Sequence, residues 1–367
     1  MFINPLLATT LLSLGLLSFY YSYFFLKLNI YKSSALNFSE PISIIVCAKN
    51  EFHNLKEKLP AILNQDYPNY EIIVVNDQSV DDTTVLLKEL KKQYHNLVVV
   101  TIEKHINERP GKKFALTLGI KTAKYEQLLL TDADCIPNSK NWAMQMCSNF
   151  NSADIVLGYG SYERKKGLLN KLIRFDTFNV AQQYLSYALA GQTYMGVGRN
   201  MAYKKSLFFE NKGFANHLHI TSGDDDLFIQ EIVTKNNVSI EITEQAHTTS
   251  TVIEKWREWA YQKRRHITTA SLYKTKFKIL LTLYPYAQTL FWAALFLLFL
   301  IKAPLQFCII LLGVKIFLSY LVNYKAMKIL KVMDLYWMHP VYEIMYLCIQ
   351  GIFVLLNIVS KPKKWSR

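Results

Sequence analysis

Long apolar runs lie toward both ends of the chain, and a region of mixed polarity separates them. The first run, Pro5–Leu26, carries no charged residue over its 22 positions. As a helix it would be about 33 Å long, enough to cross the hydrocarbon core of a bilayer. Because it lacks the basic start and the small-residue cleavage site of a signal peptide, we interpret it as an uncleaved membrane anchor.

The apolar pattern returns after residue 275. Ile279–Ile301 is uncharged over 23 residues, and Ala303–Asn323 and Val341–Ser360 each contain a single charge. Between the last two, Lys325–Lys331 is an amphipathic stretch of the kind that rests at a membrane interface. We therefore predict a C-terminal membrane domain with two or three spans and an interfacial helix.

Ionisable residues beside and within these runs bear on the topology. Lys27 and Lys32 follow the first run, so the positive-inside rule places the next domain in the cytoplasm, as in a bacterial inner-membrane protein. The basic tail 361–367 prefers the same side, which requires one C-terminal segment to be re-entrant or interfacial. Lys315 and Glu343 lie within apolar runs, where they either pair or each reach toward an interface.

Between the membrane segments, short β-branched runs alternate with helical periodicity. The expected strands are Ile42–Val46, Glu71–Asn76, Leu97–Ile102 and Gln127–Thr131, and the expected helices are Leu55–Gln65, Asp81–Tyr94 and Lys113–Ala123. Continuous apolar strands alternating with helices are typical of an α/β fold with a mainly parallel, doubly wound sheet. We place the domain boundaries at residues 1–32 for the anchor, 40–267 for the α/β domain and 275–367 for the C-terminal membrane domain.

Composition narrows the class of partner. The net charge of +14 fits nucleic acid, anionic lipid or a phosphorylated substrate, and the cations beside apolar runs favour lipid over nucleic acid. The five cysteines are scattered, with no CxxC pair. Neither a disulfide framework nor a zinc site is indicated, and a reducing compartment fits best.

The clearest chemical signal is an Asp-x-Asp pair, Asp132 and Asp134, directly after the apolar strand Leu128–Thr131. Ligands of open parallel sheets bind beyond the carboxyl ends of the strands, so both acids would border a crevice. Neighbouring carboxylate oxygens suit a hard divalent cation such as Mg²⁺ or Mn²⁺ that keeps positions free for phosphate. The alternative is a solvated turn or a helix cap, which the position after a strand makes less attractive.

Two further segments would face the same crevice. Glu51 lies just beyond the first strand, and Asp77 ends the second, where a carboxylate can accept the N–H of a uracil or a ribose hydroxyl. Asp77 could equally cap the helix that follows. Arg109, Lys112 and Lys113 precede or open a helix, an arrangement suited to phosphate, although a solvated basic loop has the same composition.

Taken in order, these motifs resemble family 2 glycosyltransferases. The matching segments are CAKNE, VVNDQS, GKKFALTLG, LLLTDADC, GVGRNMAY, GDDDL and the stretch from Trp259 to His266, which resembles the Gln/Arg-x-x-Arg-Trp motif of membrane-integrated members. They extend from Pro41 to His266, about 225 residues. Ceramide glucosyltransferases and polysaccharide synthases are among these members.

The resemblance implies a GT-A fold and a metal-dependent, inverting transfer of a sugar from a nucleotide-diphospho-sugar, with UDP the expected nucleotide. It assigns the nucleoside to Ala48, Glu51 and Asp77 and the diphosphate to Asp132 and Asp134, with Asp134 binding the divalent metal directly. From their charge and their place at the start of a helix, we expect Lys112 and Lys113 to bind phosphate as well. It also assigns the general base to one of Asp224, Asp225 and Asp226, and we favour Asp225. Arg265 would assist the departing diphosphate.

The chain departs from the family pattern in two places. Three consecutive aspartates replace the usual acidic motif, and His266 stands where the family usually has Trp. Within the helix predicted for Trp256–His266, the spacing of Trp259, Gln262, Arg265 and His266 places them on one face. We expect that face to border the substrates, unless the helix is only a basic stretch that attracts anionic lipid.

Two other functions compete. A phosphatase-like fold also places Asp-x-Asp after a strand, but it accounts for neither the Asp77 crevice nor the membrane segments. A non-catalytic membrane scaffold with a vestigial sugar-nucleotide domain would not require acidic residues at all three motifs. The acceptor is either a lipid or, in a processive polysaccharide synthase, a growing glycan. About four membrane helices are few for a translocation channel, so we favour a lipid.

Overall fold

The computed structural model describes residues 5–33, 38–103, 111–218, 220, 222–360 and 362. Its centre is a seven-stranded sheet in the order β3-β2-β1-β4-β8-β6-β9. The strands are β1 Ile42–Ala48, β2 Tyr70–Asp77, β3 Leu97–Ile102, β4 Gln127–Asp132, β6 Ile155–Gly158, β8 Met201–Lys204 and β9 Val238–Glu241. A smaller sheet, in the order β5-β10-β7, joins Cys135–Pro137, Thr248–Ser250 and Gly160–Tyr162.

The four N-terminal strands of the main sheet are parallel, because a helix between each strand and the next returns the chain to the same edge. Only β8 runs antiparallel to its neighbours β4 and β6, while β9 pairs in parallel with β6. The prediction of a mainly parallel α/β sheet is confirmed, and all four predicted strands are present.

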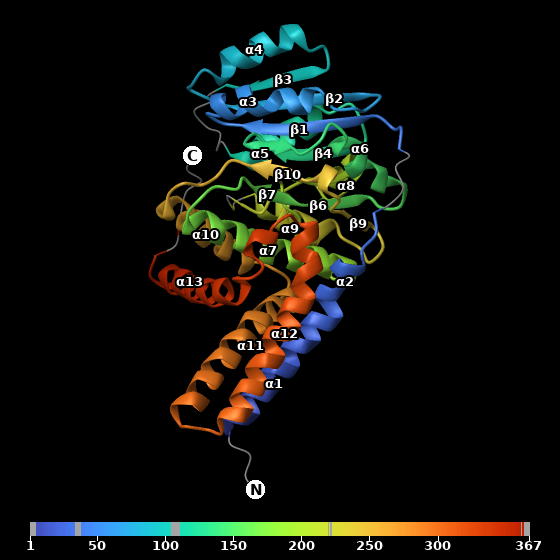
Figure 1. The fold of residues 1–367 in the computed structure, drawn as a ribbon. Helices are drawn as coiled ribbons and strands as arrows, with labels where there is room; N and C mark the ends of the chain where they lie inside the picture. The colour runs from blue at the N-terminus through green and yellow to red at the C-terminus, as the bar shows by residue number, and fades with distance from the viewer. Residues whose placement is uncertain are drawn as a thin grey trace.

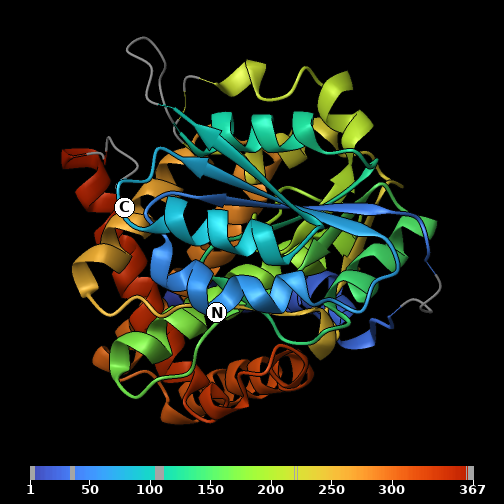
Figure 2. The same ribbon diagram turned by 90° about the horizontal axis from the view of Figure 1, so that it is seen from above.

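Helices cover both faces of the sheet (Figure 2). The first face carries α3 Phe52–Leu63, α4 Thr83–Gln93 and α6 Trp142–Cys147, and the second carries α5 Lys112–Thr122, α7 Leu168–Leu189 and α9 Asp226–Ile232. The short α8 spans Lys205–Glu210 and α10 spans Trp256–Ala270. Apolar side chains of both layers are buried against the strands, which leaves the strand ends as the place where polar groups meet.

Four helical segments among the described residues are long and apolar enough to cross a membrane: Pro5–Ile30, Thr275–Leu300, Leu305–Ile329 and His339–Val359. The first comprises α1 Pro5–Phe19, a π-helical segment Tyr20–Phe25 and α2 Leu26–Ile30, and the others are α11, α12 and α13. In Figure 1, α1, α11 and α12 run together away from the sheet, whereas α13 lies across the base of the globular part.

Two expectations about the membrane region can be compared with this arrangement. No separate interfacial helix forms around Lys325–Lys331, because α12 continues through Lys325 and Lys328 to Ile329. Lys315 of α12 pairs with Glu343 of α13, and the Trp292 indole of α11 donates to the same carboxylate at 3.0 Å. Of the two predicted arrangements, pairing is confirmed: each buried charge is compensated by the other, and neither side chain extends to an interface.

Candidate active site

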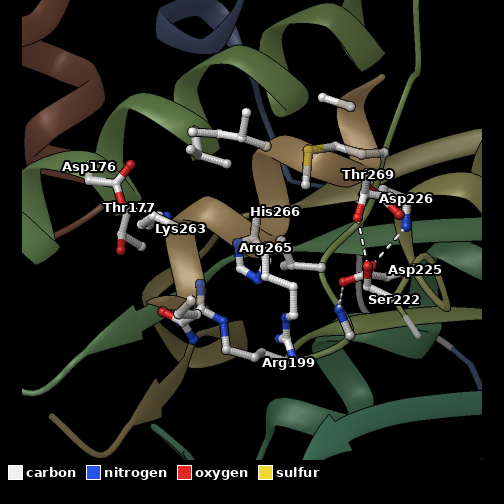
Figure 3. Close-up of a pocket in the computed structure, with 18 of the residues that line it drawn as sticks. Asp176, Thr177, Arg199, Ser222, Asp225, Asp226, Lys263, Arg265, His266 and Thr269 are labelled. Carbon is white, nitrogen blue, oxygen red and sulfur yellow. Dashed lines mark hydrogen bonds and ion pairs between the residues drawn. The ribbon is translucent and has the colours of Figure 1, made fainter. Parts of the chain in front are cut away.

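A cavity of about 1840 Å³ begins at the carboxyl ends of β1, β2 and β4 and continues to α11 and α13. Most of the site residues expected from the sequence line it: Ala48, Glu51, Asp77, Lys112, Asp132, Asp134, Asp224, Asp225, Asp226, Gln262, Arg265 and His266. Lys113 and Trp259 do not. Figure 3 shows part of this cavity, with residues from α7, α10 and the 222–226 segment around it.

The strand register explains why distant motifs meet. Ala48 of β1 lies opposite Asn76 of β2, one residue before Asp77, and Cys47 lies opposite Asp132 of β4. Parallel strands in register end at the same edge, so their last side chains share one crevice. Three segments more than 25 residues apart in sequence therefore contribute to one end of the cavity.

Asp77 is a buried acid with unused acceptor capacity. Its side chain is only 2% exposed, and it forms an ion pair with Lys49, whose Nζ lies 3.9 Å from Asp77 Oδ2. Burial raises the pKa of Asp77, and Lys49 opposes this rise. Neither carboxylate oxygen accepts a hydrogen bond within the part of the chain that the structure describes. A buried acceptor of this kind is costly unless a ligand donates to it.

The Asp-x-Asp pair has the chemistry of a divalent-metal site. Potential ligand atoms of Asp132, Asp134 and Cys135 all lie within 4.8 Å of one another. The Asp134 carbonyl is held by the buried Lys58 ammonium, at 3.0 Å, and by the Thr251 amide, at 3.1 Å. These contacts fix the turn between β4 and β5, so the carboxylates are presented by a rigid segment. Oxygen ligands on a fixed turn fit Mg²⁺ or Mn²⁺.

Lys112 connects the metal-site acids to the downstream acidic motif. Its ammonium lies 2.9 Å from Asp132 Oδ1 and 3.0 Å from Asp224 Oδ2. Burial would lower the pKa of Lys112, but the carboxylates of Asp132, Asp224 and Asp225 outweigh this effect and hold that pKa well above its usual range. Lys112 therefore stays cationic where a donor diphosphate would lie.

The three consecutive aspartates have different partners. Asp225 precedes α9, where its Oδ1 accepts from the Asp226 amide and its Oδ2 accepts from the Gly198 amide at 3.0 Å. Asp226 accepts from the Tyr273 hydroxyl at 2.6 Å and from the Leu227 amide at 2.8 Å. Gly223 permits this turn, since its φ is +93° and a Cβ there would lie 2.6 Å from the side chain of Leu227.

Burial raises the pKa of both Asp225 and Asp226. For Asp225 the carboxylate of Asp224 adds to the rise and Lys112 opposes it. For Asp226 burial and the Asp225 carboxylate raise the pKa to about 7. The loop therefore holds carboxyl groups that bind protons more tightly than ordinary aspartates, as general bases near neutral pH do.

Lys113 does not occupy the crevice that the sequence led us to expect. Its Nζ donates to the carbonyls of His217 at 2.6 Å and Ile220 at 3.1 Å, and it lies 2.8 Å from His217 Nδ1. Adjacent residues on a helix point about 100° apart, so when Lys112 faces the acids Lys113 cannot. Arg109 of the same motif lies outside the described residues.

Only part of the predicted face of α10 borders the cavity. Gln262, Arg265 and His266 line the cavity, whereas Trp259 is buried and packs edge-to-face against Phe353 of α13, with ring centroids 5.7 Å apart. Trp259 therefore does not border the cavity with the other three residues of this face, and the expectation that it contacts the substrates is wrong. The indole instead joins α10 to α13 because α13 covers that side of the helix.

His266 is exposed to the cavity but surrounded by protein and by cations. Burial and the charges of Lys263, Arg265 and Arg199 lower its pKa well below the usual range for histidine. The imidazole is therefore neutral at physiological pH. It can donate or accept a hydrogen bond, but it adds no positive charge.

Sequence reasoning missed several polar residues of this cavity. Arg199 follows a glycine in the GVGRNMAY segment, and its guanidinium stacks on the Tyr162 ring at 4.8 Å. Its place in that motif was a usable signal. Asp176 of α7 pairs with Lys263 of α10, and both line the cavity. Nothing in the sequence around Asp176 marks it, since its position depends on how α7 packs against α10.

Two similar sequences come from bacterial proteins. The chain is 36% identical over 119 residues to a poly-beta-1,6-N-acetyl-D-glucosamine synthase of Staphylococcus epidermidis, a match covering 31% of this chain and 28% of that protein. It is 31% identical over 192 residues to a poly(ribitol-phosphate) beta-glucosyltransferase of Bacillus spizizenii, covering 51% and 28%. The chain thus spans under a third of the length of each of these two relatives.

A solved structure extends the comparison to the whole fold. A mannosyltransferase from Pyrobaculum calidifontis, in complex with GDP-Man and Mn²⁺, superposes with a TM-score of 0.63 at 18% identity, covering 96% of this chain and 99% of that one. At this identity the likeness shows the fold alone. Residues 43–210 match the family Glycosyl transferase family 2. Residues 43–210 therefore belong to glycosyltransferase family 2, as the motifs predicted, and the sheet that they help to build has the GT-A fold.

Proposed function

We propose that this enzyme transfers a sugar from a UDP-linked donor to a membrane lipid by metal-dependent, inverting displacement. The observation that carries the proposal is the continuity of the cavity. It joins Asp77, Asp132 and Asp134 at the strand ends to Thr289 of α11 and Leu355 of α13. Its volume exceeds the roughly 300–1,000 Å³ of ordinary small-molecule sites, which leaves room for two substrates.

The donor would occupy the strand end. The unsatisfied acceptor oxygens of Asp77 suit the N–H of a uracil or a ribose hydroxyl, with Ala48 and Glu51 beside them. Lys112 and Arg265 would face the diphosphate, and the forked guanidinium of Arg265 can donate two parallel hydrogen bonds to it. Gln262 and His266, from the same helix, would contact the substrates as neutral hydrogen-bonding groups.

Asp132 and Asp134 would hold a divalent metal, with Asp134 as a direct ligand. A bound Mg²⁺ or Mn²⁺ supplies positive charge that offsets the charge of the leaving diphosphate. Lys58 and Thr251 keep the Asp134 turn in place, and Lys112 adds a second, fixed cation to the same region.

Asp225 would act as the general base. Asp226 is already committed to Tyr273 and Leu227, and Asp224 pairs with Lys112. Asp225 is oriented by two amide donors and lines the cavity. Its raised pKa makes it a stronger proton acceptor than an ordinary aspartate. An acceptor hydroxyl at this carboxylate would lie on the side of the loop that leads toward the membrane helices.

Charge near the membrane helices supports a cytoplasmic catalytic domain. The ends of the helices nearest the domain carry many lysines, and the connection between α11 and α12 carries Lys302. Those near the domain are Lys27, Lys32, Lys274, Lys276, Lys278, Lys325, Lys328 and Lys331. Lys331 also pairs with Glu244 of the globular part at 2.6 Å, so α12 returns to the domain side. The positive-inside rule then places this side in the cytoplasm.

We further propose that α13 lies along the membrane surface rather than across it. It lies crosswise to α1, α11 and α12 in Figure 1, and Arg264 of α10 donates to Asn357 of α13 at 2.9 Å. Its outer face presents exposed apolar side chains, among them Ile344, Ile352 and Ile358. With three crossings, α13 would lie on the cytoplasmic side, the side that the positive-inside rule favours for the basic residues from 361 on, all of which lie outside the described residues.

A second candidate function is a processive polysaccharide synthase, and the names of the similar staphylococcal proteins favour it. The experiment that separates the two uses the purified, vesicle-reconstituted protein and a panel of radiolabelled UDP-sugars. Label that partitions into organic solvent supports a lipid acceptor, whereas label retained in a large aqueous polymer supports the synthase. No release of UDP from any donor in the panel would contradict the UDP assignment.

A further inference from the structure

Beyond the strand ends, the cavity is lined by α10, which supplies Lys263 and Arg265, and by α7, α11 and α13. On α7, α11 and α13 the lining residues recur at helical spacing. All three helices are fully described, and none of these lining residues is lysine, arginine or histidine. The charged ones are Asp176 and Glu343, both acids.

Uncharged polar groups dominate the rest of this lining. Amides come from Asn179, Gln183, Gln288 and Gln350. Apolar side chains also line this part, among them Leu347, Val354 and Leu355 of α13. Amides hydrogen-bond hydroxyl groups well, but they supply no charge to balance a phosphate.

Lys263 of α10 is the cation that lies nearest to the Asp176 side of this region, and Asp176 already pairs with it. The Asp176 side chain is 1% exposed and that of Lys263 is 16% exposed. In Figure 3 this pair lies on one side of the cavity and Asp225 and Asp226 lie on the other, with Arg265 and His266 between them. Burying an ion pair costs desolvation free energy, so its presence in a cavity wall is weak evidence for a purely stabilising role.

The three consecutive aspartates, Asp224, Asp225 and Asp226, also favour an acceptor without charge. A phosphate acceptor would bring a charge of about −1.5 to −2 next to three consecutive aspartates. It would also need no base, since its second proton is lost with a pKa of about 6. A hydroxyl acceptor is uncharged and does need a base, which the raised pKa of Asp225 suits.

We infer that the acceptor is a lipid whose reactive group is an uncharged hydroxyl, and that Asp176 and Lys263 bind a further polar group of its head. This inference rests on the proposed glycosyl transfer. In the reaction, the hydroxyl oxygen forms a bond to the anomeric carbon as the bond from that carbon to the diphosphate oxygen breaks. The electron pair leaves with the nucleoside diphosphate, and the hydroxyl proton passes to the carboxylate of Asp225.

Matched lipid pairs test the acceptor class. The full-length protein is reconstituted in phosphatidylcholine vesicles containing diacylglycerol or phosphatidic acid, or a polyprenol or its phosphate, with a UDP-sugar that it cleaves. We expect glycolipid formation from at least one uncharged lipid to exceed that from its phosphorylated partner by at least about tenfold. Preference for a phosphorylated partner, or UDP release without transfer to any of the four lipids, would overturn the inference. Neither result would affect the donor reaction, whereas absence of UDP release would sink the proposed function instead.

Variants test the Asp176–Lys263 pair. Asp176→Asn and Lys263→Met should each raise KM for the accepted lipid by about tenfold and leave KM for the UDP-sugar within about twofold, and Asp176→Glu should recover part of the loss. A purely structural pair would instead lower Tm and change both KM values together. Asp154→Asn, which breaks the surface pair between Asp154 and Lys204, is the matched control and should change neither KM. Unaltered acceptor KM in both cavity variants would remove the pair from the acceptor site.

Discussion

The two ends of the cavity differ in the kind of polar group that lines them. At the strand end, the Lys112 ammonium lies 2.9 Å from a carboxylate oxygen of Asp132 and 3.0 Å from one of Asp224. Asp77 and Asp134 line the same end of the cavity. At the membrane end, most of the lining consists of amides, hydroxyls and apolar side chains from α7, α11 and α13, and the acids there, Asp176 and Glu343, are each paired with a lysine. A charged donor and a metal require fixed opposite charges, whereas a lipid requires apolar surface with few hydrogen-bonding groups. This difference is what the proposed function requires, with the donor and the metal at the strand end and the lipid at the other end.

The largest expected effect is at the metal site of the strand end. Asp134→Ala should reduce sugar transfer by at least about a thousandfold, because losing a ligand removes several kcal/mol of charge stabilisation in the transition state. The assay is transfer from a labelled UDP-sugar in vesicles, and excess EDTA should have the same effect on the wild type. The protein should remain folded and membrane-bound, as checked by Tm and flotation. Full wild-type activity in EDTA would contradict a metal role.

Substitutions can separate the roles of the three consecutive aspartates, Asp224, Asp225 and Asp226, which also line the cavity. Asp225→Asn should lower kcat for transfer by about 10²–10⁴, the usual contribution of a general base, with the donor KM nearly unchanged. Asp226→Asn should cost much less, since asparagine still accepts from the Tyr273 hydroxyl. If Asp226→Asn proves the more damaging of the two, the base has been assigned to the wrong aspartate.

Within the membrane region, the buried charges of Lys315 and Glu343 should behave as a unit. Lys315→Met or Glu343→Gln alone should destabilise the protein by about 3–5 kcal/mol, because each leaves one uncompensated charge. The double variant should recover much of that loss. Thermal unfolding in one detergent measures all four proteins. Strictly additive losses would argue against energetic coupling between the two residues.

Arg265→Lys keeps the charge on α10 but loses the forked geometry. We expect turnover to fall by about tenfold, equivalent to about 1.4 kcal/mol of transition-state stabilisation. The matched control is Arg164→Lys, at an exposed arginine that pairs with Asp334 and does not line the cavity, and it should leave turnover unchanged. Near wild-type turnover with intact membrane association would show that Arg265 has no role in the site. Its charge would then only attract anionic lipid, an interaction of about 1 kcal/mol near the membrane surface.

The last prediction concerns stability, rather than activity, as a function of pH. The pKa of Asp226 is raised to about 7, whereas an unfolded aspartate titrates near 3.9. Between these values the native state holds a proton that the unfolded state has lost, so Asp226 makes stability fall as pH rises from about 4 to about 7. Tm of Asp226→Asn should therefore decline less over this range than Tm of the wild type. Parallel Tm curves would show that Asp226 titrates normally.

Much of the strand end was predictable from the sequence. Asp77, Asp132 and Asp134 stand directly at the ends of apolar strands, and parallel strands end at a common edge, so local pattern alone brings them together. The same reasoning failed for Lys113, because which side of α5 faces the acids depends on the packing of that helix. It failed for Trp259 because α13, about 90 residues later, covers that side of α10.

The sequence by itself determined the α/β fold, the family, the apolar helices and the acids at the strand ends. The helices and the acids follow from periodicity or spacing within one short segment, and the fold and the family follow from the order of several such segments along the chain. The tertiary structure decided the partners of the three aspartates, the pairing of Lys315 with Glu343, and the meeting of Asp176 with Lys263. These contacts join helices far apart in sequence, and they depend on which helix face is buried. That choice minimises unpaired polar groups and exposed apolar surface over the whole molecule, and no single segment encodes it.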